Sequence, residues 1–177
     1  MGHGIDVDFF SPDENTLRGT AVLSAGRLSQ TKRHDLVIRA AEHFPNDVRI
    51  VGGGPEKHNL EKLADQLSLS PRVHFIGPQT QECLREEYRR AGVFVHTSET
   101  GSLDKVVLEA LAYGLPVITT AASLADLPVT IVSPTPSAIA AEVLANQQGD
   151  ARALAAYVQE HHSLQKLIPA MLQLLMS

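Results

Sequence analysis

Cysteine and tryptophan are almost absent from this sequence of 177 residues, which holds one cysteine, Cys83, and no tryptophan. A single cysteine cannot form an internal disulfide, so a disulfide-stapled fold is excluded. A lone thiol fits a reducing compartment, and we therefore expect the protein to be cytoplasmic. The helical pattern around Cys83 predicts that its side chain lies in the core.

Long apolar runs and long basic runs are missing as well. Because no signal peptide and no span of about twenty apolar residues occurs, any membrane contact should be peripheral, at the inner face of the membrane. The 15 Lys and Arg residues are outnumbered by 20 Asp and Glu residues, which argues against sequence-independent binding to nucleic acid. The 44% of hydrophobic residues are enough to build the core of a globular domain.

Motifs for metal binding and for acyl transfer are also lacking. No compact ligand spacing with acidic partners joins the histidines, which include His34, His58, His74, His96, His161 and His162. Ser24, Ser98 and Ser102 have no nucleophile-elbow context. We expect neither a metal nor a cofactor. His96, at the end of a predicted strand, is the histidine that could touch a bound sugar or phosphate.

Short β-branched runs alternate with longer amphipathic stretches along the chain. The runs predict strands over residues 20–26, 47–54, 72–77, 92–98, 115–120 and 129–133. Apolar residues between them recur at helical spacing, and Tyr88 is predicted to face the core from one such helix. The alternation predicts an α/β fold with a Rossmann-like parallel β-sheet flanked by helices on both faces.

The pattern divides the chain into three segments. Residues 1–19 are predicted to be a connector that enters the domain. Residues 20–135 are predicted to form the Rossmann-like domain. Residues 136–177 have a helical pattern without strands, and we expect these helices to pack on the same domain.

The loops that follow the strands should carry the chemistry, because ligands of such sheets bind at the carboxyl ends of the strands. The loop "GRLSQTK" places Arg27 and Lys32 at a helix start, where two cations suit a diphosphate. A solvated turn is the alternative. Gly53 in "VGGGP" and Gly77 in "FIGPQT" could let the backbone approach a ligand, or could simply form turns.

The fourth loop, "HTSETGSLDK", leads directly into a helix that carries Glu109 between Leu108 and Ala110. A helix that starts near Leu103 or Asp104 would point its first free backbone amides at a phosphate. Glu109 itself is either a functional carboxylate or only the solvent-facing position of its helix.

Five segments, in this order and at these intervals, resemble the C-terminal half of the family 4 (group 1) glycosyltransferases over about residues 4–120. They are "GIDVDFFSP", "SAGRLSQTK", "IVGGGPEKHNLEKLADQLSLSPRVHFIGPQ", "YRRAGVFVHTS" and "VVLEALAYGLPVI". The resemblance implies a GT-B fold, in which two Rossmann-like domains face each other and the C-terminal one holds a nucleotide-sugar. It also implies a further domain upstream, which would hold most of the acceptor.

The resemblance assigns roles to three residues. Arg27 and Lys32 match the cations that neutralise the departing diphosphate, and these are the predicted catalytic residues. Glu109 matches the glutamate that holds the ribose hydroxyls, a task that suits a carboxylate because it can accept two hydrogen bonds from a vicinal diol.

One family residue is replaced in this sequence. The family has a second glutamate eight residues before the ribose glutamate, followed by a Phe-Gly pair, and here that position is Gly101. The sugar contacts would then come from Glu99, from Asp104 or from the amides of Gly101 and Ser102. Lys105 could add a phosphate contact or be only a solvated lysine. The predicted donor-binding set is Gly53, Gly77, Glu99, Gly101, Ser102, Leu103, Asp104, Lys105 and Glu109.

The resemblance therefore predicts the donor-binding half of a retaining, metal-independent glycosyltransferase. The whole enzyme would move a hexose, for example mannose in polysaccharide biosynthesis, from a nucleoside diphosphate to a glycan or lipid-linked acceptor. Without its upstream domain the chain should bind donor but not transfer it. The alternatives are a GT-B epimerase or phosphorylase relative, and a non-catalytic Rossmann-like module that binds a nucleotide or a protein partner.

Overall fold

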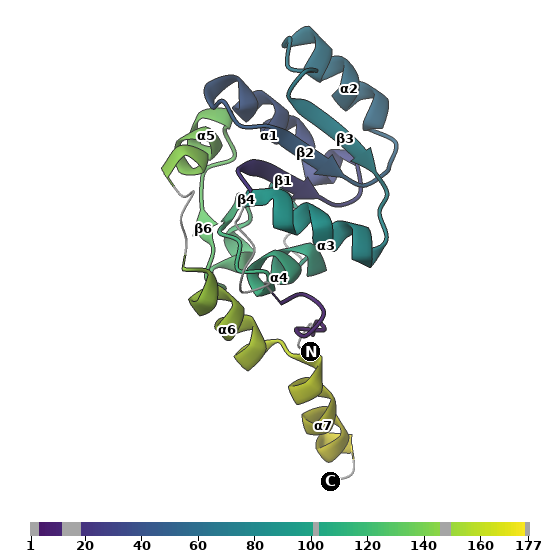
Figure 1. Cartoon of the computed structure of the whole chain (residues 1–177), viewed down its shortest axis with the longest axis vertical. Coiled ribbons are helices and arrows are strands. Elements are labelled where there is room, and N and C mark those ends of the chain that lie inside the picture. Colours follow the sequence, from purple (N-terminus) through teal and green to yellow (C-terminus); the bar gives the residue numbers. More distant parts are fainter. Residues whose placement is uncertain (1–3, 12–18, 101–102, 146–149, 176–177) are drawn as a thin grey trace.

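The computed structural model describes residues 4–11, 19–100, 103–145 and 150–175. Its centre is a six-stranded sheet in the order β3-β2-β1-β4-β5-β6, with every neighbouring pair parallel. The α/β, Rossmann-like fold class predicted from the sequence is confirmed (Figure 1). The strands are β1 (Ala21–Ala25), β2 (Val48–Val51), β3 (Val73–Gly77), β4 (Ala91–His96), β5 (Val117–Thr119) and β6 (Thr130–Ile131).

Each predicted strand exists, although all six are shorter than the runs that predicted them. β2 ends at Val51 because Gly52 turns the chain with a φ of 138°, a conformation that a side chain at this position would disfavour. β4 ends at His96, after which Thr97 leaves the sheet. All six residues of β4 are buried, as expected for a central parallel strand that is covered on both faces.

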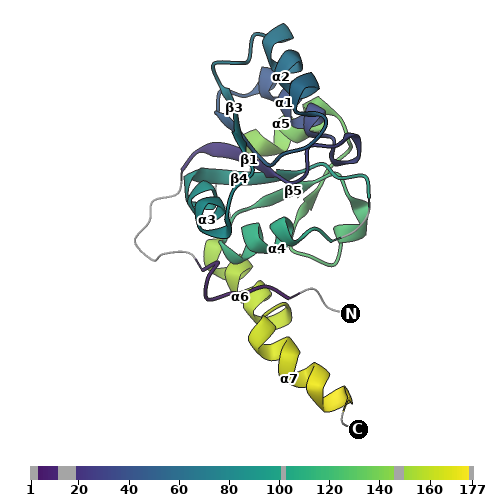
Figure 2. The same ribbon diagram turned by 90° about the vertical axis from the view of Figure 1, so that its right-hand side faces the viewer.

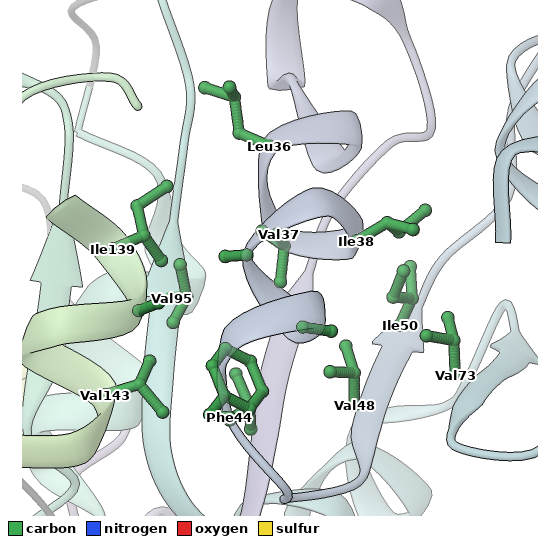
Figure 3. Packing of buried hydrophobic residues seen from close by; sticks show 14 of the residues in the cluster. Leu36, Val37, Ile38, Phe44, Val48, Ile50, Val73, Val95, Ile139 and Val143 are labelled. Atoms are coloured by element: carbon green, nitrogen blue, oxygen red, sulfur yellow. The ribbon is translucent and has the colours of Figure 1, made fainter. Parts of the chain in front are cut away.

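Helices α1 (His34–Ala40), α2 (Lys57–Gln66) and α5 (Pro136–Ala145) cover one face of the sheet (Figure 2). Two short 3-10 helices, η1 (Gln30–Lys32) and η2 (Ala41–His43), flank α1. Figure 3 shows how α1 and α5 interlock with the strands on this face. The core side chains drawn there include Val37, Ile38, Phe44, Val48, Ile50, Val95, Ile139 and Val143.

Helices α3 (Gln81–Arg90) and α4 (Lys105–Ala112) cover the opposite face, α6 (Ala151–His161) packs against α4, and the 3-10 helix η3 (Ala122–Leu124) follows β5. Tyr88, Phe94 and Leu108 lie at the centre of this second cluster. The prediction for Cys83 was wrong, because its side chain is exposed on α3. The core-facing side of that helix is formed instead by residues such as Tyr88.

The segment before β1 is part of the second hydrophobic cluster. Ile5 and Phe10 are buried, and the Phe10 ring meets Tyr88 edge-on at 6.1 Å. The backbone of Ile5 donates to His162 and accepts from Leu164, which ties the segment to the start of α7 (Leu164–Leu175). Figure 2 shows α7 extending away from the sheet. No helix in the described ranges has the length and apolar character needed to cross a bilayer.

The packing of α5 yields a test of whether residues after 135 belong to the same core. Ile139 is fully buried between α5 and the sheet. Ile139→Ala should lower the free energy of unfolding by about 2–5 kcal/mol, because the cavity left behind adds to the lost burial. Leu144→Ala on the same helix is the control, since Leu144 is 53% exposed and should cost less than about 0.5 kcal/mol. Urea unfolding of both variants measures this, and equal losses would contradict the packing of α5.

Candidate functional site

The candidate site lies where the sheet changes its winding direction. β1 pairs with β4, yet the chain continues from β1 to β2 on one side and from β4 to β5 on the other. The segments 26–33 and 97–100 follow the carboxyl ends of these two neighbouring strands. Such a switch point is where open α/β sheets bind their ligands.

Backbone and side-chain hydrogen bonds hold the two loops together. The Thr97 hydroxyl lies 2.8 Å from the carbonyl oxygen of Lys32 and 3.0 Å from that of Arg33. The amide of Glu99 donates to the carbonyl oxygen of Thr31 at 2.9 Å. Because Thr97 and Ser98 are buried, this contact between the loops is part of the protein interior.

Arg33 adds an ionic tie between the loops. Its backbone is left-handed, with φ 49° and ψ 38°, a conformation that costs roughly 1–2 kcal/mol for a residue with a side chain. Its guanidinium binds Asp35 at 3.0 Å and Glu99 at 2.5 Å, and these hydrogen bonds raise the pKa of Arg33. The carboxylate of Glu99 contacts Arg33, while 57% of its side chain remains exposed.

Lys32 and Asp104 form the central ion pair of the site. The Lys32 ammonium lies 2.5 Å from Oδ2 of Asp104 and donates to the Ser98 hydroxyl at 3.2 Å. Nε2 of His96 lies 2.9 Å from the same Oδ2 atom. One carboxylate oxygen of Asp104 thus contacts two nitrogen atoms, one from Lys32 on η1 and one from His96 at the end of β4.

Burial and charge act in opposite directions on this cluster. Burial disfavours the charged form of Asp104, but the hydrogen bonds from Lys32 and His96 outweigh burial and lower the pKa of Asp104. Burial lowers the pKa of His96 more than Asp104 raises it. The ring of His96 is therefore neutral at pH 7, with Nε2–H donating to Asp104 and with Nδ1 3.0 Å from the Thr119 hydroxyl.

The start of α4 has an unusual cap. Asp104 occupies the N-cap position with extended backbone angles, φ −77° and ψ 132°, yet its side chain accepts no helix amide. An N-cap aspartate ordinarily accepts from the second or third helix amide. Here the carboxylate points to Lys32 and His96 instead, so the first turn of α4 has no side-chain cap.

Glu109 is buried on α4, with 7% of its surface exposed. Oε2 accepts a hydrogen bond of 2.9 Å from the hydroxyl of Tyr88, which is fully buried. Burial raises the pKa of Glu109, and the Tyr88 bond acts against that rise. The alternative of a solvent-facing glutamate is wrong. This contact joins positions 21 apart and was missed from the sequence, where the only signal was a tyrosine on the core face of its helix.

The other predicted residues lie around this centre. Arg27 is exposed and forms no ion pair within the described part of the chain. Lys105 is exposed at the first position of α4, and Leu103 is half-buried beside it. Gly101 and Ser102 lie outside the described residues.

The predicted glycines Gly53 and Gly77 accept backbone hydrogen bonds from neighbouring loops. The carbonyl oxygen of Gly53 accepts from the amide of Leu28 at 3.0 Å, and that of Gly77 accepts from Gly52 at 2.9 Å. A Cβ atom on Gly52 would lie 1.9 Å from the carbonyl oxygen of Gly26, so only glycine fits there. Gly77, with φ 80°, has no atom within 4 Å of such a Cβ and faces open space.

Lys32, the exposed Lys105 and the amides at the start of α4 are groups of the kind that suit an anion, and the buried carboxylate of Glu109 lies further along the same helix. No group of three or more His, Cys, Asp or Glu side chains in the described ranges is arranged for a metal ion.

Comparison with known proteins identifies the family. A family model of the group 1 glycosyl transferases matches residues 9–166. The chain belongs to the group 1 glycosyltransferases. The D-inositol 3-phosphate glycosyltransferase of Mycobacterium sp. strain KMS is 38% identical over 144 residues, which are 72% of this chain and 32% of that protein. This glycosyltransferase chain thus spans about a third of the length of that relative.

Solved structures agree on the fold of this glycosyltransferase chain. HepE of Anabaena, solved in complex with UDP and glucose, has a TM-score of 0.84 at 17% identity and covers 98% of this chain and 55% of its own. The C-terminal domain of the group 1 protein LpcC from Francisella tularensis has a TM-score of 0.75 at 22% identity, covering 91% of this chain and 100% of its own. The chain has the architecture of the C-terminal domain of a GT-B glycosyltransferase.

A buried histidine next to the site gives a prediction about stability. His34 is 3% exposed, its Nδ1 lies 3.1 Å from the Ser24 hydroxyl, and burial lowers its pKa to about 4. Because the folded pKa lies below the unfolded value of about 6.5, the stabilisation is complete above pH 6.5 and is lost as the pH falls toward 4. Relative to His34→Asn, the wild type should lose roughly 2–3 kcal/mol of unfolding free energy between pH 7 and pH 4.

Thermal or urea unfolding across this pH range measures the difference between the two proteins. The exposed His58 provides the control, since His58→Asn should keep the pH dependence of the wild type. Parallel curves for His34→Asn and the wild type would contradict a neutral, buried His34.

Proposed function

We propose that this chain is the donor-binding domain of a retaining, metal-independent hexosyltransferase that uses a nucleoside diphosphate sugar. The observation that carries the proposal is the contact of Lys32 with Asp104 at the start of α4, whose first turn has no side-chain cap and whose next turn carries the buried Glu109. These groups match the parts of such a donor, which has a charged diphosphate and a neutral ribose diol.

The diphosphate would lie against the loop 26–33 and the start of α4. Lys32, Arg27 and the helix amides would meet the negative charge that develops as the sugar–phosphate bond breaks. Helix amides carry a partial positive charge at an N-terminus, and a phosphate is favoured there. The cations would do the work that a metal ion does in other phosphate sites.

The ribose would be held by Glu109. Oε2 accepts from Tyr88, which fixes the rotamer of the carboxylate, and Oε1 accepts no hydrogen bond from the described residues. A carboxylate held in this way can accept from a ribose hydroxyl without losing its own buried partner. Tyr88 would thus be a positioning residue for the ribose site.

The sugar contact would come from Asp104 rather than Glu99. Glu99 is held by Arg33 and is largely exposed, whereas Asp104 lies beside Lys32. Retaining stereochemistry and mannose as the transferred hexose stay predictions from the family resemblance. An NMR spectrum that resolves the anomers of the product of the full-length protein tests the stereochemistry.

The relatives support this donor class. HepE is a structure with UDP and glucose, and the mycobacterial relative carries the name of an inositol phosphate glycosyltransferase. A glycan, a lipid-linked sugar or another hydroxyl compound would be the acceptor, bound by an upstream domain. Peripheral contact with a membrane stays a prediction. The competing function is a non-catalytic nucleotide-binding module, which Gly101 in the glutamate position favours.

The first test is donor binding by the isolated chain. Titration calorimetry with UDP-glucose, GDP-mannose and ADP-glucose should give one preferred donor, with a Kd in about the high micromolar to millimolar range because only one wall of the cleft is present. Transfer to acceptors should require the full-length protein. The absence of binding to every donor would contradict the proposal, and transfer by these 177 residues alone would contradict the half-enzyme interpretation.

Glu109→Ala should weaken binding of the preferred nucleoside diphosphate about thirtyfold, or about 2 kcal/mol, because the charge-assisted hydrogen bonds to ribose are lost. Glu109→Gln, which is closer in shape, should act in the same direction. Glu61→Ala removes a half-exposed carboxylate from α2 and should leave affinity unchanged. If Glu109→Ala folds and binds within a factor of three of wild type, the ribose role is wrong.

Lys32→Gln and Arg27→Gln separate the diphosphate from the ribose. Both should weaken nucleoside diphosphate binding more than binding of the free nucleoside, because only the former carries charge. The wild-type advantage should shrink with added salt. Lys62→Gln, an exposed lysine on α2, is the matched control. Equal losses for nucleoside and nucleoside diphosphate would refute the diphosphate assignment.

A further inference from the structure

The cation best placed for a diphosphate already has a partner. Lys32 is bound to Asp104 at 2.5 Å, and the two side chains are only 19% and 23% exposed. In partly buried surroundings such a pair is screened less than a surface pair. A phosphate that uses Lys32 must therefore compete with Asp104.

Moving Asp104 away from the site would also be unfavourable, because its position is tied to the start of α4. Asp104 is the N-cap residue of α4, and its carboxylate is bonded to Lys32 and His96 instead of to the helix amides. Without Lys32, Asp104 would be a partly buried carboxylate next to a bound diphosphate. Like charges at this distance repel, so the site needs a compensating positive charge.

We propose, on the basis of the donor site described above, that a bound diphosphate takes Lys32 from Asp104 and that His96 then takes up one proton and remains the partner of Asp104. The proton comes from solvent and adds to Nδ1 of His96, while Nε2–H keeps donating to Asp104. No covalent bond changes. Asp104 and His96 thus form a counter-ion pair that couples donor binding to proton uptake.

The surroundings of His96 accommodate both protonation states. In the neutral ring, Nδ1 accepts from the Thr119 hydroxyl at 3.0 Å. In the protonated ring, Nδ1–H donates to the same oxygen, because a hydroxyl can act as donor or acceptor. Thr119 also accepts from the amide of Ala121 at 3.1 Å, which holds the oxygen in place.

After Lys32 has moved to the diphosphate, the charged groups around His96 favour the protonated form of its ring. Before binding, burial and the positive charge of Lys32 lower the pKa of His96, and Asp104 raises it. After binding, Lys32 is neutralised by phosphate, Asp104 lacks its cation, and the diphosphate adds negative charge. His34, the titratable group that faces His96 from α1, has a pKa of about 4 and stays neutral at pH 7.

The sign of the pH dependence follows from this exchange. Since the pKa of His96 is higher in the bound state, the gain in affinity is complete below the free-state pKa and disappears as the pH rises through the bound-state pKa. Affinity should change by up to about tenfold for each pH unit by which binding raises the pKa of His96.

Calorimetry in buffers of different ionisation enthalpy measures the proton directly. The probes are UDP-glucose and GDP-mannose, whose diphosphate diesters do not titrate near neutral pH. Wild-type protein should take up a proton on binding, and affinity should fall from pH 6 to pH 8. His96→Gln keeps a nitrogen donor for Asp104 but cannot titrate, so it should bind without proton uptake and with a flat pH profile.

Asp104→Asn distinguishes a displaced counter-ion from a purely structural cap. Asparagine is tolerated at an N-cap position but has no charge, so Lys32 is released without a counter-ion exchange and the variant should bind the probes with no proton uptake, whatever the loss of a sugar contact does to the affinity. Thermal unfolding checks that the variant folds, and Asp104→Ser is a second uncharged N-cap. Wild-type proton uptake by Asp104→Asn would overturn the inference.

The outcomes separate this inference from the donor site itself. If the wild type binds neither probe, the proposed donor site fails. If the wild type binds a probe without taking up a proton, the donor site stands and the Asp104–His96 exchange is wrong.

Discussion

The pairing of β1 with β4 is the constraint on which the rest of this molecule depends. These two strands are adjacent in the sheet although the chain builds β2 and β3 between them. Right-handed crossovers then force α1 and α2 to one face and α3 and α4 to the other. The loops after β1 and β4 consequently end at one place, and Lys32, His96 and Asp104 meet there although 72 positions separate the first from the last.

Several polar side chains are buried in the domain, and three of them have a partner on another element. Glu109 accepts from Tyr88, His34 is bonded to Ser24, and Arg49 on β2 forms an ion pair with the buried Glu87. A buried polar group without a partner would cost more than the bond itself contributes. The polar centres therefore fix the relative positions of α1, α3 and α4, and the candidate site takes its precision from them.

Electrostatic preorganisation is built into the loops before any ligand arrives. Arg33, whose backbone is in the left-handed conformation, forms ion pairs with Glu99 and Asp35. Lys32 forms an ion pair with Asp104. A flexible lysine loses considerable side-chain entropy when it is ordered on a ligand. In this site much of that ordering has already taken place, so a bound diphosphate exchanges one partner of Lys32 for another.

The sequence alone determined the elements, because buried parallel strands and amphipathic helices have different hydrophobic periods. It placed Arg27 on the loop after β1 and Glu109 on the helix after β4, where the structure also has them, whereas Lys32 lies in the short 3-10 helix η1. Only the tertiary structure decided which side chains touch. The Tyr88–Glu109 bond, the sharing of Asp104 between Lys32 and His96, and the exposure of Cys83 depend on strand order and on helix rotation. Local periodicity does not fix strand order, because strand order arises from long-range pairing. It does not fix helix rotation either, because a rotation by one residue exchanges a core position for a surface one.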